Sequence, residues 1–312
     1  MPGGADGQIG WKSEATPGTG VVVDTFLPIR SENIKQDIEY MDTQTMSARK
    51  VLRLTKQGTK TIEGSVTTEL PNVDIAELLA HMFGGVSFAT GVHTFTPDDL
   101  TGKALTVQVG RPASTGTVHP FTYSGCKVGT WSLNASVGEI ATLEFGLVGM
   151  TETTGTALAS AAYDTDWQPF VFTEASLTIG GSSAGTVKEL SLDGDNAIEA
   201  RVRLGSATSK EPLEIGLRTY EGTVLTDFDD LTHYNLFVAG TETALVAKFE
   251  NGAGDILEFT LNIQFTGETP ELSGFDLLEQ SLPFRVISST SDADGITATL
   301  TNDETEFVFP AA

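Results

Sequence analysis

The first clear element in the hydrophobic pattern is a short amphipathic helix between residues 72 and 84. Its apolar side chains recur at i, i+3, i+4 and i+7, which places them on one helix face. Asn72 is positioned to cap the start and Gly84 to end the helix in a left-handed conformation. The side chains expected to form the helix core are Ile75, Leu78, Leu79 and Met82.

A second, weaker helical stripe follows near residue 230. Leu231, Tyr234 and Val238 are spaced so that they lie on one face and are expected to form its core. Asp229 is the expected cap, because an acidic side chain suits the positive end of the helix dipole. Gly240 is the expected end of this helix.

Most of the remaining chain alternates apolar and polar residues with period two, which predicts β-strands. Asn251-Gly252 separates two such runs and predicts a hairpin. An amphipathic helix must bury its stripe, and the surface available here is the face of a sheet. The sequence therefore predicts a mainly β fold, a β-sandwich or partial barrel with one packed helix, present twice. The alternating runs are 105–109, 131–135, 143–147, 177–179, 198–202, 244–249 and 257–265.

The two halves of the chain resemble each other. Thr61-Ile62-Glu63-Gly64-Ser65-Val66 precedes the first helix, and Thr219-Tyr220-Glu221-Gly222-Thr223-Val224 precedes the second. A small, polar stretch at 151–162 lies between the halves and is typical of a linker. We therefore expect a duplicated module, with a first domain at 1–155, a second at 156–290 and a C-terminal extension at 291–312. That extension is expected to dock on a neighbouring subunit or to add an edge strand.

The charge of the chain excludes one class of partner. The 312 residues hold 18 Lys and Arg against 42 Asp and Glu, a formal net charge of −24. Such a chain repels phosphates, so wrapping of nucleic acid is excluded. The charge is uneven: residues 1–155 hold 16 acids and 11 bases (16 − 11 = 5, net −5), and residues 156–312 hold 26 acids and 7 bases (26 − 7 = 19, net −19). No apolar run reaches the length of a membrane span, so no membrane partner is expected.

Several short patterns suggest chemistry, but each has a simpler interpretation. The four histidines lack metal-ligand spacing, the acids at 227–230 suit a helix start, and Asp292-Ala293-Asp294-Gly295 is a turn rather than a calcium loop. Gly181-Ser182-Ser183-Ala184-Gly185 matches a hydrolase motif in letters, but a strand rather than a helix follows it, which favours a hairpin. Cys126, the only cysteine, is expected to be a buried structural thiol. We expect no catalytic residues, no bound metal, no cofactor and no enzyme activity.

A further set of short segments resembles a known family when taken in order. They are Phe26-Leu27-Pro28, Gly64-Ser65-Val66, His93-Thr94-Phe95-Thr96-Pro97, Phe121-Thr122-Tyr123-Ser124-Gly125-Cys126, Ser136-Val137-Gly138-Glu139, the run at 172–179 and Asp276-Leu277-Leu278-Glu279-Gln280. With these segments the chain resembles the major tail tube proteins of long-tailed, non-contractile bacteriophages (siphophages), in a tandem version, over roughly residues 20–290.

The resemblance implies a structural virion protein that polymerises as stacked rings and conducts genome DNA into the host. Two domains in each chain imply trimeric, pseudo-sixfold rings, with true hexamers as the alternative. The implied partners are other copies of the chain, the tail terminator and tail tip proteins, a tape measure protein inside the lumen, and double-stranded DNA in non-specific transit. The implied location is the virion tail, assembled in the host cytoplasm. An acidic lumen would keep DNA from binding to the wall, at short range because salt screens beyond about 8 Å.

In that family, a long loop reaches the adjacent ring. The matching segments here are 42–50 and 204–212, which an ordinary hairpin loop would also explain. The candidate inter-ring residues are Thr43, Gln44, Thr45, Met46, Arg49, Ser206, Thr208 and Lys210. A function from another class also fits a β-sandwich: a monomeric surface or carbohydrate-binding module. Such a module needs an exposed aromatic platform, and Trp11, Trp131 and Trp167 are well separated in the sequence.

Overall fold

The structure is a computed structural model that describes residues 3–45, 50–52, 54–267, 269, 277–289 and 294–311. It is mainly β, with large antiparallel sheets arranged as a sandwich, and this confirms the predicted fold class. The described residues contain two α-helices, α1 (Ala76–Phe83) and α2 (Thr232–Ala239), and two single-turn 3₁₀ segments, η1 (Gly4–Asp6) and η2 (Phe172–Glu174).

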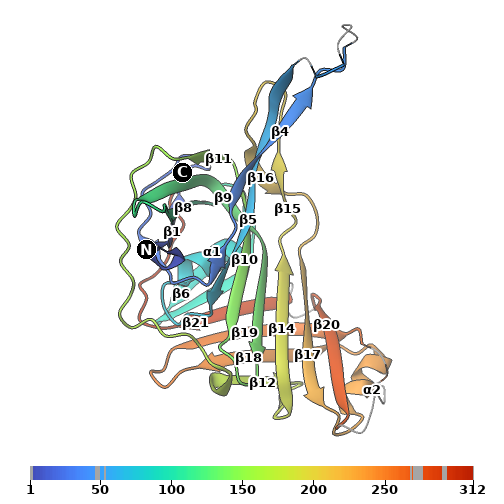
Figure 1. The fold of residues 1–312 in the computed structure, drawn as a ribbon. Coiled ribbons are helices and arrows are strands. Elements are labelled where there is room, and N and C mark those ends of the chain that lie inside the picture. The colour runs from blue at the N-terminus through green and yellow to red at the C-terminus, as the bar shows by residue number, and fades with distance from the viewer. Residues whose placement is uncertain are drawn as a thin grey trace.

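The larger layer is a sheet of long antiparallel strands in the order β5–β10–β9–β14–β17–β20 (Figure 1). Strands β9 and β14 come from different halves of the chain and pair over seven residues, from Glu189 opposite Ser136 to Asp195 opposite Thr130. The two halves therefore share one continuous sheet. The strands are β5 (Thr55–Glu69), β9 (Val118–Ser136), β10 (Thr142–Gly149), β14 (Val187–Asp195), β17 (Thr219–Asp227) and β20 (Glu279–Val286).

The second layer runs across the first in Figure 1, in the order β12–β18–β19–β21–β7–β6. Alternating side chains of both layers fill the space between them, as in crossed sheet packing. Trp131 of the first layer and Phe259 of the second stack with ring centroids 6.4 Å apart. The strands are β6 (Gly84–Ala89), β7 (Val92–Pro97), β12 (Ala175–Ile179), β18 (Thr243–Glu250), β19 (Ile256–Phe265) and β21 (Ile296–Thr301), and β13 (Ser182–Ser183) pairs with β12.

A third, smaller group of strands curves around α1 and closes a partial barrel (Figure 1). It contains β8 paired on one side with β1 and on the other with the first part of β9. The helix residues Ile75, Leu78, Leu79 and Met82 are each at most 1% exposed within this enclosure. The strands of this group besides β9 are β1 (Gln8–Glu14), β2 (Thr25–Phe26), β8 (Ala104–Pro112) and β11 (Thr151–Thr153). The short strand β3 (Ser31–Glu32) pairs with β5 of the larger layer.

The predicted core of the second helix is wrong. Leu231 is 56% exposed and Val238 is 62% exposed, while Tyr234 is only partly buried. The side chains of α2 that pack against the core are Leu236 and Phe237. Three apolar residues over two turns make a stripe too narrow to determine which face turns inward.

Both predicted helix caps are also wrong. Asn72 precedes the first helical residue by four positions, and its amide instead binds Asp255 and the backbone around residue 166. At α2, Asp230 rather than Asp229 accepts the hydrogen bond from the Thr232 N–H, at 2.7 Å.

The start of α1 is capped from the far end of the chain. Strand β21 lies between β19 and β7, so this part of the C-terminal segment is an interior strand of its own chain. The residues that follow cross α1, and the Glu304 carboxylate accepts hydrogen bonds from the N–H groups of Ile75 (3.3 Å) and Ala76 (3.2 Å). A carboxylate is favourable there because it satisfies unpaired N–H groups at the positive end of the helix dipole.

Two glycines at matching places in the halves tolerate no side chain. A Cβ at Gly64 would lie 2.4 Å from Ile34 Cα, and a Cβ at Gly222 would lie 2.3 Å from the Ser191 carbonyl oxygen. We expect Gly64→Ala and Gly222→Ala each to lower the free energy of unfolding by about 2–3 kcal/mol, because backbone atoms must shift. Denaturant unfolding measures this. Gly129→Ala is the control, since its nearest contact would be an ordinary 3.5 Å, and equal losses in all three would contradict the steric explanation.

The raised pKa of Asp74 predicts how the stability of the fold changes with pH. Burial, with Glu304 and Asp164 nearby, raises its pKa from 3.8 to about 6. A carboxyl whose pKa is raised by folding destabilises the fold when ionised, and this penalty disappears as pH falls through 6 towards 4. We therefore expect Asp74→Asn to be more stable than the wild type at pH 8, with an advantage that vanishes near pH 4. Thermal unfolding across this range measures it, and a constant advantage would contradict the account.

Candidate assembly surface

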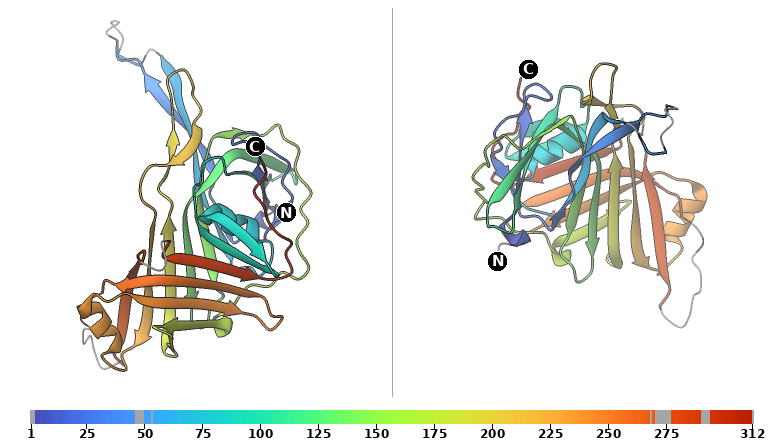
Figure 2. Two further views of the ribbon diagram at one scale, coloured as in Figure 1. Left: turned by 180° about the vertical axis from the view of Figure 1, so that it is seen from behind. Right: turned by 45° about the horizontal axis from the view of Figure 1, so that its top comes forward.

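The most prominent surface feature is a hairpin that stands clear of the sandwich in all three views (Figures 1 and 2). It consists of β4 (Lys35–Asp42) and the first part of β5, and we call it the arm. A second hairpin, β15 (Ile198–Arg201) and β16 (Lys210–Glu214), lies beside it. The Lys60 N–H donates to the Ala207 carbonyl at 2.8 Å, which joins the two hairpins directly.

The second of the two segments predicted to make inter-ring contacts therefore lies against the arm at Lys60, and the first lies further along the same arm. Thr43, Gln44 and Thr45 follow β4 on the arm. On the second hairpin, Thr208 forms a bridge with Lys60, the Ser206 hydroxyl donates to the Thr208 carbonyl at 2.9 Å, and Lys210 begins β16. Met46 and Arg49 lie outside the described residues.

The arm exposes large apolar side chains. Val51 is 76% exposed, and the other four are 49–59% exposed. Isolated exposed apolar residues are normal, but several gathered on one projecting hairpin mark a surface for interaction. The four are Tyr40, Met41, Leu52 and Leu54.

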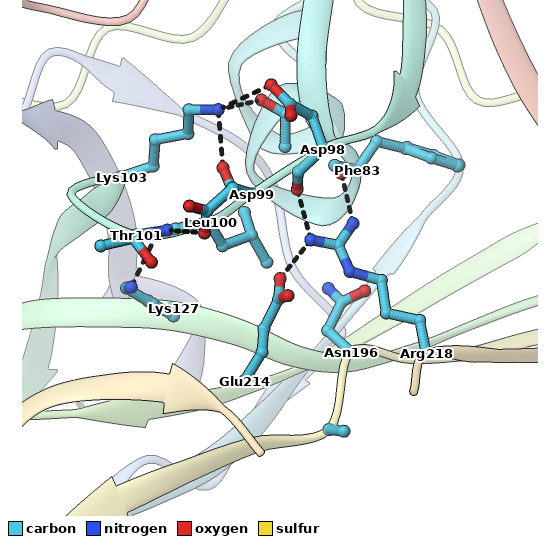
Figure 3. Close-up of polar contacts among 12 residues, drawn as sticks. Phe83, Asp98, Asp99, Leu100, Thr101, Lys103, Lys127, Asn196, Glu214 and Arg218 are labelled. Atoms are coloured by element: carbon cyan, nitrogen blue, oxygen red, sulfur yellow. Dashed lines mark hydrogen bonds and ion pairs between the residues drawn. The ribbon is translucent and has the colours of Figure 1, made fainter. Parts of the chain in front are cut away.

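A buried polar cluster anchors the second hairpin to the first half (Figure 3). Arg218 follows β16, and its guanidinium donates to the Phe83 carbonyl at 2.6 Å, to the Asp98 carbonyl and to Glu214. Asn196 precedes β15, and its amide donates to the Met82 carbonyl at 2.8 Å and the Val128 carbonyl at 3.0 Å. These bonds satisfy carbonyls at the end of α1, so they hold the hairpin and the helix in one orientation.

Lys127 forms the second part of this anchor. Its side chain is 1% exposed, and its ammonium donates to Glu211 and to the Leu100 carbonyl, both at 2.7 Å. Burial lowers the pKa of Lys127, and the hydrogen bond and charge of Glu211 oppose that shift. Glu211 also accepts the Gly102 N–H at 2.6 Å, so one carboxylate on β16 links β9 to the turn before β8.

A second surface feature is the outward face of the large sheet. On β14, Leu190 and Leu192 face the core, while Glu189, Asp193 and Asp195 face outward. The same alternation of inward apolar and outward polar side chains continues on the neighbouring strands, where Ser and Thr residues separate the outward charged residues. The outward carboxylates are Glu63, Glu69, Glu144, Glu189, Asp193, Asp195, Glu221, Asp227 and Glu279, and the outward bases on these strands are Lys188 and Arg285.

The register places some of these charges directly opposite one another. Asp193 lies opposite Glu221 on β17, and Ser132 lies between Asp193 and Glu144 in the same row. Like charges opposite each other destabilise a sheet. The stability of the isolated chain therefore does not explain this row.

The other residues considered for chemistry are part of the fold. His81 is buried, its Nε2 lies 2.6 Å from the Ser13 hydroxyl, and burial lowers its pKa to about 3. Cys126 is buried, which raises the pKa of its thiol. Ser182 and Ser183 form the short strand β13, which folds back on β12, and the following strand β14 pairs with β9 and β17 rather than with β12. Asp227 pairs with Lys188.

The described residues contain no group of three or more His, Cys, Asp or Glu side chains arranged to hold a metal ion. They also contain no helix that is long and apolar enough to cross a membrane.

The chain belongs to the phage tail tube protein family, whose model matches residues 4–286. It is thus a structural component of the virion tail, in a family whose members assemble into a tube. A search of curated proteins found no significant match.

The anchor of the second hairpin generates a prediction. Glu211→Ala leaves the buried Lys127 ammonium without its carboxylate, and we expect a loss of about 3 kcal/mol in the free energy of unfolding. The double variant Lys127→Met with Glu211→Leu replaces the ion pair by apolar packing and is expected to lose much less. Urea denaturation of both variants compares them, and a double variant as unstable as Glu211→Ala would contradict this interpretation.

Proposed function

We propose that this chain is the major subunit of a siphophage tail tube and polymerises as stacked rings around an acidic lumen that conducts genome DNA. The observation that carries the proposal is the outward face of the β5–β10–β9–β14–β17–β20 sheet. It is rich in Ser, Thr, Asp and Glu, and it is continuous across both halves. A wall of this kind repels phosphates, because its outward carboxylates outnumber its outward bases.

We further propose that the chain consists of two tandem tail tube domains, 1–155 and 156–290, with 291–312 as an extension. The first half contains the arm hairpin, whose strand β5 carries the sterically required Gly64, and then α1. The second half contains the β15–β16 hairpin, then β17 with the sterically required Gly222, and then α2. Each helix ends at a glycine of positive φ, 96° at Gly84 and 60° at Gly240. This repetition favours trimeric rings with pseudo-sixfold symmetry, with a hexamer as the alternative.

The remaining parts of the proposal follow from this role. The arm and the second hairpin make the contacts between rings. The partners are further copies of the chain, the tail terminator and tail tip proteins, a tape measure protein inside the lumen, and double-stranded DNA in transit. Assembly takes place in the host cytoplasm, and the chain carries out no catalysis and uses no cofactor.

Electron microscopy of the purified chain tests the assembly. We expect tubes of stacked rings, with three copies per ring seen down the axis. A chain that stays monomeric under all assembly conditions and binds glycans on an array would instead support the alternative of a carbohydrate-binding module.

A charge-reversed wall tests the lumen. Asp193→Lys with Glu221→Lys gives the proposed wall two bases per chain in place of two acids, and assembled tubes of this variant are expected to retain short duplex DNA at low salt. Asp37→Lys with Glu39→Lys is the matched control, because these residues lie on β4 of the arm. Equal DNA retention by both variants, or by neither, would contradict the proposed position of the lumen.

A further inference from the structure

The arm differs in charge from the rest of the molecule. Residues 35–60 contain six of the 18 bases in the chain against three acids, Asp37, Glu39 and Asp42 (6 − 3 = 3, net +3). Removing this segment from the total leaves −24 − 3 = −27 for the other residues. Lys50 and Lys56 are exposed, next to the exposed apolar residues Val51, Leu52 and Leu54. The arm is therefore both cationic and apolar, on a chain that is otherwise strongly acidic.

The opposite end of the large sheet carries complementary features. We define the base as the end where β14 begins and β17 ends, farthest from the arm in Figure 1. It contains an apolar groove of about 230 Å³, in which Leu177 is buried while Val137 and Phe172 are 61% and 38% exposed. Glu189 and Lys188 also line this groove, and Lys188 is paired with Asp227 and Glu279.

An acidic hollow of about 540 Å³ adjoins the groove. The two share Ser183, Ala184 and Gly185 in their walls, so they form one continuous surface. Asp227, Asp229 and Asp230 line the hollow. Asp227 is neutralised by Lys188 at 2.6 Å, whereas Asp229 is exposed.

We propose that the base groove and hollow receive the arm of a second copy of this chain. The occupant is a second copy because the arm is the basic, apolar segment of this chain and the base is an acidic, apolar surface. The two surfaces lie at opposite ends of the molecule, so each copy offers an arm to one neighbour and a base to another. A head-to-tail contact produces an open polymer when the rotation that relates successive copies does not close a ring.

This docking rests on the proposed function, because it specifies how one ring binds the next. It differs from the lateral contacts within a ring, which would use sheet edges. The charge pairs supply the direction and register of stacking, and the apolar side chains supply the buried area. Loss of the docking should therefore leave rings intact and remove only their stacking.

Charge reversal tests the docking. Lys50→Glu with Lys56→Glu on the arm, and Glu189→Lys with Asp229→Lys on the base, place like charges in contact, and each pair is expected to weaken stacking at least about tenfold. Neither pair removes a helix cap or an ion pair of the fold. The chain that carries all four substitutions restores opposite charges, so it should form tubes again. Sedimentation and electron microscopy measure tube yield.

A disulfide trap tests the contact itself. The only native cysteine, Cys126, is buried, so oxidation is expected to form disulfides between the introduced cysteines alone. Leu52→Cys with Val137→Cys is expected to produce a ladder of covalent multimers after oxidation of assembled tubes. Leu52→Cys with Val22→Cys is the control, because Val22 is 72% exposed and lies outside the base.

The outcomes separate the two proposals. The docking would be overturned, and the tube proposal left standing, if the wild type forms tubes and both charge-reversed variants stack normally. A covalent ladder that forms only with Val22→Cys would have the same meaning. A wild-type chain that forms neither rings nor tubes would overturn the proposed function, and with it the docking. A ladder that depends on Val137→Cys, together with recovery in the four-substitution chain, supports both.

Discussion

The pairing of β9 with β14 is the interaction on which the rest of the structure depends. It joins strands from the two halves of the chain over seven registered residue pairs, so both halves contribute to one sheet. Because side chains alternate along each strand, this register determines which residues face the core and which face outward. A shift of one residue would bury Asp193 and expose Leu192, so the acidic face and the hydrophobic core are two consequences of one register.

The same sheet separates the features proposed for assembly. The arm projects from one end of the sheet (Figure 1). The groove and hollow lie where β14 begins and β17 ends, and the outward carboxylates lie along the strands between. The buried anchor of Arg218 and Lys127 holds the second hairpin against the end of α1. Such buried charges contribute little net stability, but they are satisfied in one arrangement of the hairpin.

Much of the fold could be predicted from the sequence, because alternation with period two reports directly on sheet faces. The strands, the hairpin at Asn251-Gly252 and the position of the first helix are confirmed. The helix caps and the buried face of α2 could not be predicted. The cap of α1 comes from Glu304, more than 200 residues away, and the inward face of α2 depends on what lies beneath Leu236 and Phe237.

The candidate surfaces were partly visible in the sequence. The segments 42–50 and 204–212 were identified by their matching places in the halves, but only the fold shows that the two hairpins lie side by side at Lys60 and Ala207. The acidic sheet face was missed, because its members are spread over six strands and look like ordinary solvated charges one at a time. A strand-by-strand count of outward acids, aligned by register, was the signal that could have found it.

The most direct measurement is a cryo-electron microscopy map of the assembled tube in which strands β9, β14 and β17 can be traced. The account predicts that the face bearing Glu144, Asp193 and Glu221 lines the central channel, with two related modules from each of three chains around the axis. A map in which this face points to the outer surface of the tube, or is buried between subunits, would contradict it.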